Sequence, residues 1–432
     1  MDNAIRFIDL FAGIGGIRQG FELACKKYGF QTKCVLTSEI KPHAIDIYNL
    51  NYPNEKISGD ITQIPSDAIP DFDFLLAGFP CQAFSSAGRR LGFLDTRGTL
   101  FFEVERILGD KKPQGFILEN VEGLVTHDRV DKKDRIGRTL TTILNRLQGL
   151  GYSVSWEVLD AKNFGVPQER KRIYIIGTKV GNPILCNSPV TKTTLSFVLE
   201  KGLETSKSDF VELLLDHYPV DKLYGKSIKD KRGGSDNIHS WDIEVKGKVS
   251  SEQKQLLNRI LTERRKKKWA EMYGIDWMDG MPLTLEHIRS FFDSHNLESM
   301  LSDLVQKKYL KMEHPKMKVE NGRKQDKSLP LGYNIVTGKM SFEVNKILDP
   351  QKNAPTLVAM DMKHIYVVDG DGIRNLSLRE GLRLFGYPEN YKFNIDKELG
   401  YDLLGNTVVV PVITFVAERL LDAFAKEELL CG

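Results

Sequence analysis

Short apolar runs alternate with amphipathic stretches through the first part of the chain. The apolar runs lie at residues 7–10, 34–38, 72–77, 115–119, 153–158 and 172–177. Between them, apolar side chains recur at helical spacing, as at Ile17, Phe21 and Ala24 behind a glycine turn. This alternation predicts an α/β fold with a doubly wound sheet, in which each apolar run forms a strand.

The rhythm is lost after residue 181. The chain then becomes richer in Lys, Asp, Ser and Gly and carries Trp241, Trp269 and Trp277. We therefore expect a first domain at 1–180, a smaller inserted domain at 181–395, and a segment at 396–432 that returns to the first domain. Residues 405–425 are predicted to form one apolar helix, with Pro411 tolerated only near its first turn.

Composition limits the classes of protein that need to be considered. The chain has 432 residues, of which 41% are hydrophobic and 28% charged, enough for about two or three soluble domains. It holds no apolar run near the roughly 18 residues of a membrane span and does not open like a secretion signal. Five cysteines without CxxC spacing argue against disulfides and a structural zinc site. We expect a cytoplasmic protein with reduced thiols and no metal.

The net charge of +3 is too small to indicate a nucleic-acid partner on its own. Basic residues do cluster at 229–232, 264–268 and 307–324. Such clusters suit a nucleic-acid partner, although a solvated helix face explains any one of them equally simply.

Residues 7–16 read as a strand that runs into a glycine-rich turn and opens a helix. Glycines such as Gly13 and Gly15 let a ligand approach the backbone, and the helix N-terminus offers free N–H groups. Nicotinamide and flavin enzymes use similar turns. Two acids after later apolar stretches, Glu39 and Asp60, could accept hydrogen bonds from ribose hydroxyls, which favours an adenosyl group at the strand ends.

The most reactive side chain is predicted to be Cys81, in Gly78-Phe79-Pro80-Cys81-Gln82. A loop thiol is more often inert, but here Pro80 stiffens the backbone and residues 84–90 form a small, basic loop suited to covering a substrate. Glu119 ends the next strand, where burial would raise its pKa and let it hold a proton for a ring nitrogen. Arg170 and Arg172 suit a phosphate or a base carbonyl oxygen, or one of them an ion pair with Glu119.

Together these residues closely resemble the DNA (cytosine-5)-methyltransferase family. The matching segments stand in the family's order and cover roughly residues 5–180 and 354–425: residues 7–16, Glu39, 59–61, 80–82, 119–121, 168–172, 379–380 with 385–388, and 405–408. The resemblance implies a doubly wound, Rossmann-like methyltransferase domain interrupted by a target recognition domain.

The resemblance also implies the site and its ligands. The cofactor would be S-adenosylmethionine, released as S-adenosylhomocysteine, with contacts from Phe11, Gly13, Gly15, Glu39, Ile40, Asp60, Ile61, Pro80, Leu100, Asn406 and Val408. Cys81 would add to C6 of a cytosine flipped from the duplex, Glu119 would bind and protonate N3, and Arg172, with Arg170, would steady the acid and the base.

The partner implied is double-stranded DNA, contacted by Gln82, Ser85, Arg97 and Thr356, with sequence read by the inserted domain. Ala87 departs from the pattern, because many relatives carry serine there. A bacterial or phage modification enzyme is expected, monomeric, nucleoid-associated, and possessing a cognate endonuclease that acts independently of it.

Three alternatives bear on this hypothesis. Amino-group methyltransferases need a Pro-Pro element, which the sequence lacks. A tRNA cytosine-5 methyltransferase keeps the same segments but usually shows Cys-Phe-Thr, also lacking here. A nicotinamide-dependent oxidoreductase would leave the segments around Cys81, Glu119 and Arg172 unexplained.

Overall fold

The computed structural model describes residues 4–80, 100–131, 133–186, 188–276, 279–319, 322–337 and 342–431. The chain divides into two compact units. Unit 1 consists of Met1–Glu200, Pro350–Lys363 and Leu376–Gly432, and unit 2 of Lys201–Asp349 and His364–Asn375. Residues 181–200, 350–363 and 376–395, which composition places in the inserted domain, thus belong to unit 1. They contribute buried apolar side chains such as Leu195, Leu357 and Phe385, which composition alone does not assign to one domain or the other.

Unit 1 is built on a six-stranded sheet in the order β2-β1-β3-β4-β6-β5. Pairing is parallel from β2 to β4, whereas β6 runs antiparallel to both β4 and β5. All six predicted strands are present, and the doubly wound α/β fold is confirmed. The strands are β1 (Ile5–Leu10), β2 (Thr32–Ser38), β3 (Phe74–Ala77), β4 (Gly115–Val121), β5 (Ser153–Asp160) and β6 (Lys171–Thr178).

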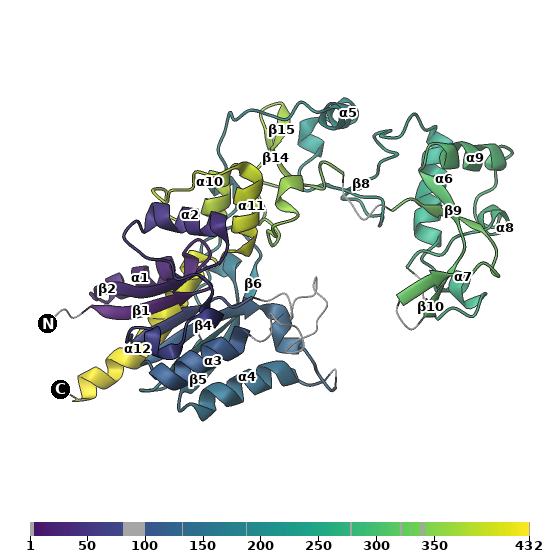
Figure 1. Cartoon of the computed structure of the whole chain (residues 1–432). Helices are drawn as coiled ribbons and strands as arrows, with labels where there is room; N and C mark the ends of the chain where they lie inside the picture. The colour runs from purple at the N-terminus through teal and green to yellow at the C-terminus, as the bar shows by residue number, and fades with distance from the viewer. Residues whose placement is uncertain are drawn as a thin grey trace. The chain divides into compact units, whose positions relative to one another are not determined.

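Helices cover both faces of this sheet (Figure 1). On one face α1 packs against α12, and Phe21 of α1 stacks between Phe7 and Phe74 at ring distances of 5.2 and 5.6 Å. On the other face α3 and α4 bury leucine, isoleucine and phenylalanine side chains against β1, β3 and β4. The helices of unit 1 are α1 (Gly16–Lys27), α2 (Pro42–Asn51), α3 (Leu100–Lys111), α4 (Arg138–Gly149), α10 (Leu378–Leu384), α11 (Lys397–Asn406) and α12 (Val410–Cys431).

The prediction of one helix over 405–425 is wrong. Gly405 and Asn406 end α11, and α12 begins only at Val410. A side chain at position 405 would collide with the backbone of Ala359, so glycine is required where the two segments cross. Pro411 lies in the first turn of α12, as expected.

Unit 2 contains two hydrophobic cores. One lies on a five-stranded sheet in the order β15-β14-β13-β7-β8, packed with α5. The other gathers Trp241, Trp269 and the helices α6 to α9 with the β9-β12 pair, and β10 and β11 form a separate hairpin. The elements are α5 (Asp209–His217), β7 (Ser227–Ile228), β8 (Asn237–Ile238), α6 (Ser251–Glu263), α7 (Lys267–Glu271), α8 (Leu285–Arg289), α9 (Leu297–Gln306), β9 (Leu310–Glu313), β10 (Lys316–Val319), β11 (Gly322–Gln325), β12 (Gly332–Ile335), β13 (Lys346–Ile347), β14 (Ile365–Asp369) and β15 (Gly372–Asn375).

Among the helices of the described residues, none has the length and apolar character needed to cross a bilayer.

Candidate active site

The turn between β1 and α1 combines open and tightly packed glycines. Phe11, Gly13 and Gly15 have φ of 55°, 55° and 78°, a backbone conformation that glycine adopts without strain. A Cβ on Gly13 would meet nothing within 4 Å, so the backbone there faces open space. A Cβ on Gly16 would lie 2.6 Å from Tyr387 Oη and 2.8 Å from Val408 Cγ2. The turn is therefore accessible at Gly13 and fixed against residues 387 and 408 at Gly16.

Glu39 lies directly beside this turn. Its Oε2 accepts the Gly13 N–H at 2.8 Å, while Oε1 accepts the N–H groups of Ile40 and Lys41, both at 2.8 Å. Three backbone donors hold the carboxylate at the end of β2. Ile40, the next residue, is 70% exposed. The two together offer a carboxylate and an apolar surface to a ligand at this edge.

Asp60 caps a short 3₁₀ helix, η1 (Ile61–Gln63), by accepting from the Thr62 N–H at 3.0 Å and the Thr62 hydroxyl at 2.9 Å. The preceding residue, Gly59, is tied to the end of β2 because its carbonyl accepts the Ser38 hydroxyl at 2.6 Å. The side chain of Ile61 is only 1% exposed and belongs to the core. Ile61 thus offers a ligand its backbone at most, whereas Asp60 stays at the surface.

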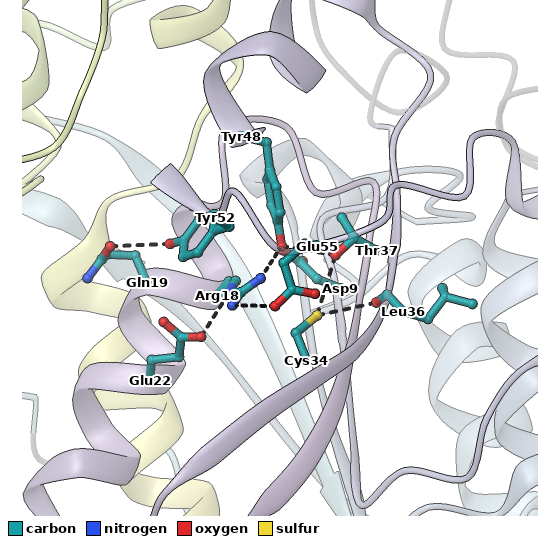
Figure 2. Close-up of polar contacts among 10 residues, drawn as sticks. All are labelled: Asp9, Arg18, Gln19, Glu22, Cys34, Leu36, Thr37, Tyr48, Tyr52 and Glu55. Atoms are coloured by element: carbon teal, nitrogen blue, oxygen red, sulfur yellow. Dashed lines mark hydrogen bonds and ion pairs between the residues drawn. The ribbon is translucent and has the colours of Figure 1, made fainter. Parts of the chain in front are cut away.

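A buried polar network, which the sequence did not reveal, underlies the glycine-rich turn between β1 and α1 (Figure 2). Arg18, on the first turns of α1, pairs with Glu22 at 2.8 Å and Glu55 at 3.0 Å, and its guanidinium stacks 3.8 Å from the centre of the Tyr52 ring. Arg18 also donates to the Tyr48 hydroxyl at 3.1 Å. The cation therefore ties α1 to α2 and to the chain that follows it.

Asp9 of β1 completes the network. It is fully buried, and Tyr48 Oη lies 3.4 Å from its Oδ2 and 3.1 Å from Thr37 Oγ1 on β2. Burial raises the pKa of Asp9 to about 7, against the opposing charge of Arg18. The available signal was a charged residue inside the apolar run 7–10, a position that demands a partner.

The strand ends that carry the predicted reactive groups lie side by side. β3 pairs with β4, as expected from their succession in the chain. Asn120 Nδ2 donates to the Phe79 carbonyl at 3.1 Å, and a Cβ on Gly78 would lie 3.7 Å from Glu119 Oε2. The backbone that leads to Pro80, the predicted cofactor contact, therefore passes beside Glu119. Cys81, Gln82, Ser85 and Arg97 lie outside the described residues.

Glu119 forms an ion pair with Arg172, whose Nε lies 3.2 Å from Glu119 Oε1. Their side chains are 12% and 14% exposed. Burial raises the pKa of Glu119, and the positive charges of Arg172 and Arg170 only partly offset it. The pair thus provides an acid that keeps its proton to higher pH than an exposed carboxyl, held in place by a guanidinium.

Arg170 is placed differently from Arg172, although both precede or begin β6. Its guanidinium donates to the backbone carbonyls of Leu357, Gly405 and Thr407 at 2.9, 3.2 and 2.8 Å. It lies 5.2 Å over the Phe385 ring and is 3% exposed. Arg170 thus contacts backbone carbonyls, whereas Arg172 pairs with Glu119, the alternative that the sequence also left open for one of the two.

The remaining predicted residues are spread over neighbouring segments. Leu100 begins α3 and is half-buried, Val408 is buried against Gly16, and Asn406 is exposed and donates to the Asp402 carbonyl at 2.7 Å. Thr356 is exposed, and its hydroxyl donates to the Glu169 carbonyl. Backbone pairing lies beside this bond: the Ala354 N–H donates to the Pro167 carbonyl, and the Ala354 carbonyl accepts the Glu169 N–H, both at 2.8 Å.

Comparison with known proteins agrees with this geometry. The sequence model of the C-5 cytosine-specific DNA methylases matches residues 5–422. The chain is 62% identical over 417 residues to the type II methyltransferase M.NlaIV of Neisseria lactamica, a match that covers 96% of this chain and 99% of the relative. It is 60% identical over 417 residues to the type II methyltransferase M.NgoBV of Neisseria gonorrhoeae, with the same coverage.

A solved structure shares the fold. The crystal structure of a putative DNA modification methyltransferase encoded within an E. coli prophage matches 98% of this chain and 100% of its own, at a TM-score of 0.54 and 20% identity. With a family match over nearly the whole length and relatives above half identity, the chain belongs to the C-5 cytosine-specific DNA methylase family.

Proposed function

We propose that the protein transfers the methyl group of S-adenosylmethionine to C5 of a cytosine within a specific double-stranded DNA sequence, through a covalent bond between Cys81 and C6. The observation that carries the proposal is the buried pair of Glu119 and Arg172 beside the backbone that leads into Cys81. A nucleophile and a proton donor at neighbouring strand ends suit attack on an electron-poor ring.

The residues at the other edge of the site fit an adenosyl cofactor. The open backbone at Gly13 allows close approach, the Glu39 carboxylate can accept from ribose hydroxyls, and exposed Ile40 can cover an apolar ring. Asp60 stands nearby at the surface. The bound cofactor would supply an electrophilic methyl group on a sulfonium.

The chain's own groups activate the cytosine ring for methyl transfer. The Cys81 thiolate adds to C6 while Glu119 gives a proton to N3, which leaves C5 electron-rich. C5 would then take the electrophilic methyl group that the bound cofactor supplies, and the electrons of the broken methyl–sulfur bond would stay on the cofactor's sulfur. Loss of the C5 proton to a base, elimination of the Cys81 thiolate from C6 and return of the N3 proton to Glu119 would restore the ring. Arg172 holds Glu119 in position and stabilises the carboxylate that remains once Glu119 has given its proton to N3.

The other described cysteines of unit 1 support Cys81 as the nucleophile. Cys25 and Cys34 are buried, and burial raises the pKa of both thiols to about 12. Neither can supply a thiolate near neutral pH. Cys186 is exposed, but it lies on the chain beyond β6, which ends at Thr178.

We further propose that unit 2 reads the DNA sequence and that methylation protects the host's DNA from a separate cognate endonuclease. Two close relatives are type II methyltransferases, which supports this setting. The flipped cytosine would enter unit 1, because both faces of a stacked base are hidden from a nucleophile and a methyl donor.

Covalent trapping tests the mechanism. Duplex DNA that contains 5-fluorocytosine should form a complex stable to denaturation with the wild-type protein and S-adenosylmethionine, because fluorine cannot leave C5 as a proton does. Cys81→Ala should give no complex while it still binds S-adenosylhomocysteine. A trapped Cys81→Ala complex, or methyl transfer by this variant, would refute the covalent route. Bisulfite sequencing of methylated plasmid DNA, with a tRNA pool assayed in parallel, reports the modified atom, the sequence and the class of nucleic acid.

A further inference from the structure

Arg170 occupies the end of a helix, not an open pocket. Two of the carbonyls that it contacts, those of Gly405 and Thr407, lie at the C-terminal end of α11, and the third, that of Leu357, lies on the segment that crosses Gly405. Gln168, two residues earlier, is also fully buried and donates to the Leu384 carbonyl at 2.9 Å. Gln168 and Arg170, just before β6, thus bind three separate backbone segments: the end of α10, the end of α11 and the segment at residue 357.

The electrostatics of this arrangement are favourable. The last carbonyls of a helix lack partners within the helix and carry the negative end of its dipole. A guanidinium placed there satisfies the carbonyls and is stabilised by them. The planar fork of arginine can reach carbonyls on two segments at once, whereas lysine presents one compact charge.

The residues held in this way flank the cofactor edge of the site. Asn406 lies between the two α11 carbonyls that Arg170 binds. Thr407 and Val408, with Tyr387, are the residues that a Cβ on Gly16 would strike. This segment therefore also packs against the glycine-rich turn between β1 and α1, residues 11–16, called the cofactor turn below. Two residues beyond Arg170, Arg172 pairs with Glu119.

We propose that Arg170 is a positioning residue that caps α11, fixes Asn406 and Val408 against the cofactor turn, and does not contact the cytosine. This inference rests on the proposed function, since it assigns to residues 406–408 a part in binding S-adenosylmethionine. Arg170 thereby connects residues 405–408, which would contact the cofactor, to β6, the strand that carries Arg172. The same strand would thus position both the methyl donor and the proton donor, Glu119.

Arg170→Lys tests the inference, with Arg383→Lys as the matched control. Arg383 of α10 also donates to a backbone carbonyl, that of Val198 at 3.2 Å, and pairs with Glu389, away from residues 405–408. For Arg170→Lys we expect the Kd for S-adenosylhomocysteine, measured by calorimetry well below the melting temperature, to rise about tenfold or more. KM for S-adenosylmethionine should rise in parallel, while kcat at saturating cofactor and KM for DNA change by less than about twofold.

Two results would overturn the inference. If Arg170 contacts the base, kcat should fall and the Kd should stay at the wild-type value, as expected for Arg172→Lys. If Arg170 only stabilises the fold, the melting temperature should fall with no change in Kd, as for Arg383→Lys, or the variant should not fold. Failure of the proposed function is distinguishable, because the wild-type protein itself would then bind no S-adenosylhomocysteine.

Discussion

Arg172 Nε lies 3.2 Å from Glu119 Oε1 across the antiparallel strands β6 and β4. The contact keeps a buried carboxyl from becoming an isolated charge and fixes the direction in which it can give a proton. The chemistry proposed for the site therefore depends on a side chain that itself makes and breaks no bond.

Removing this guanidinium should change the pH dependence of methyl transfer. Burial raises the pKa of Glu119, and Arg172 opposes the rise, so Arg172→Gln should raise the pKa further. The acid must be protonated to act, so activity falls as pH rises through its pKa. We expect kcat to drop by about 100-fold and the alkaline limb of the pH–rate profile to move to higher pH. Lys171→Gln, an exposed neighbour, is the control and should leave the limb in place.

Asp9 gives a test of stability against pH. Its pKa is raised to about 7 in the folded protein, so the folded state keeps a proton that the unfolded state loses above its ordinary pKa of 3.8. The wild type should therefore lose stability from Asp9 as pH rises from about 4 to about 7. Asp9→Asn should remove this loss. The gain in unfolding free energy of the variant relative to wild type should approach a plateau on the order of 4 kcal/mol above pH 7.

Chemical denaturation at pH 5 and pH 8 measures this gain. Asp46→Asn, at an exposed position on α2, is the control and should show the same difference from wild type at both pH values. A constant difference for Asp9→Asn would contradict the raised pKa.

Two glycines on helices should respond to alanine in opposite directions. Gly16→Ala forces a methyl group to 2.6 Å from Tyr387 Oη, so we expect a loss of about 1–3 kcal/mol in unfolding free energy and weaker cofactor binding. Gly149 ends α4 with nothing within 4 Å of an added Cβ, so Gly149→Ala should stabilise by about 0.5–1 kcal/mol. Thermal melting measures the change in stability, and calorimetric titration measures cofactor affinity. Equal changes in stability for the two variants would show that contacts of the added methyl group do not decide the effect.

The hairpin of β10 and β11 in unit 2 should contribute to DNA affinity. Lys318 and Arg323 stand directly opposite each other on exposed strands. Like charges at such a pair repel, and an anionic backbone would relieve the repulsion. Lys318→Gln with Arg323→Gln should weaken DNA binding and reduce the slope of log affinity against log salt by about 2, with cofactor binding unchanged.

Lys222→Gln is the control, at an exposed lysine of the same unit. An unchanged slope in the double variant would exclude the hairpin as a phosphate contact, while loss of discrimination between DNA sequences would indicate contact with base edges instead.

The strands were predictable because the apolar runs of a buried parallel sheet differ sharply from the chain around them. The family match decides against the nicotinamide-dependent oxidoreductase that the glycine turn alone left open. Composition did not assign residues 350–363 to unit 1, because their place there depends on hydrogen bonds to Gln168 and Arg170, which are distant in sequence. The burial of Arg18 was not predictable for the same reason. An arginine on an amphipathic helix is ordinarily solvated, and its partners Glu55 and Tyr52 lie more than 30 positions away in the sequence.

The packing of α1 against α12 has a consequence for biosynthesis. Lys27 Nζ and Glu418 Oε1 meet at 2.8 Å although 391 positions separate them in the chain. As the ribosome advances, the aromatic residues Phe7, Phe21 and Phe74 emerge long before α12, which packs against α1. Unit 1 therefore completes its hydrophobic core only after α12, residues 410–431, has been translated, and until then the nascent chain exposes apolar surface that favours aggregation.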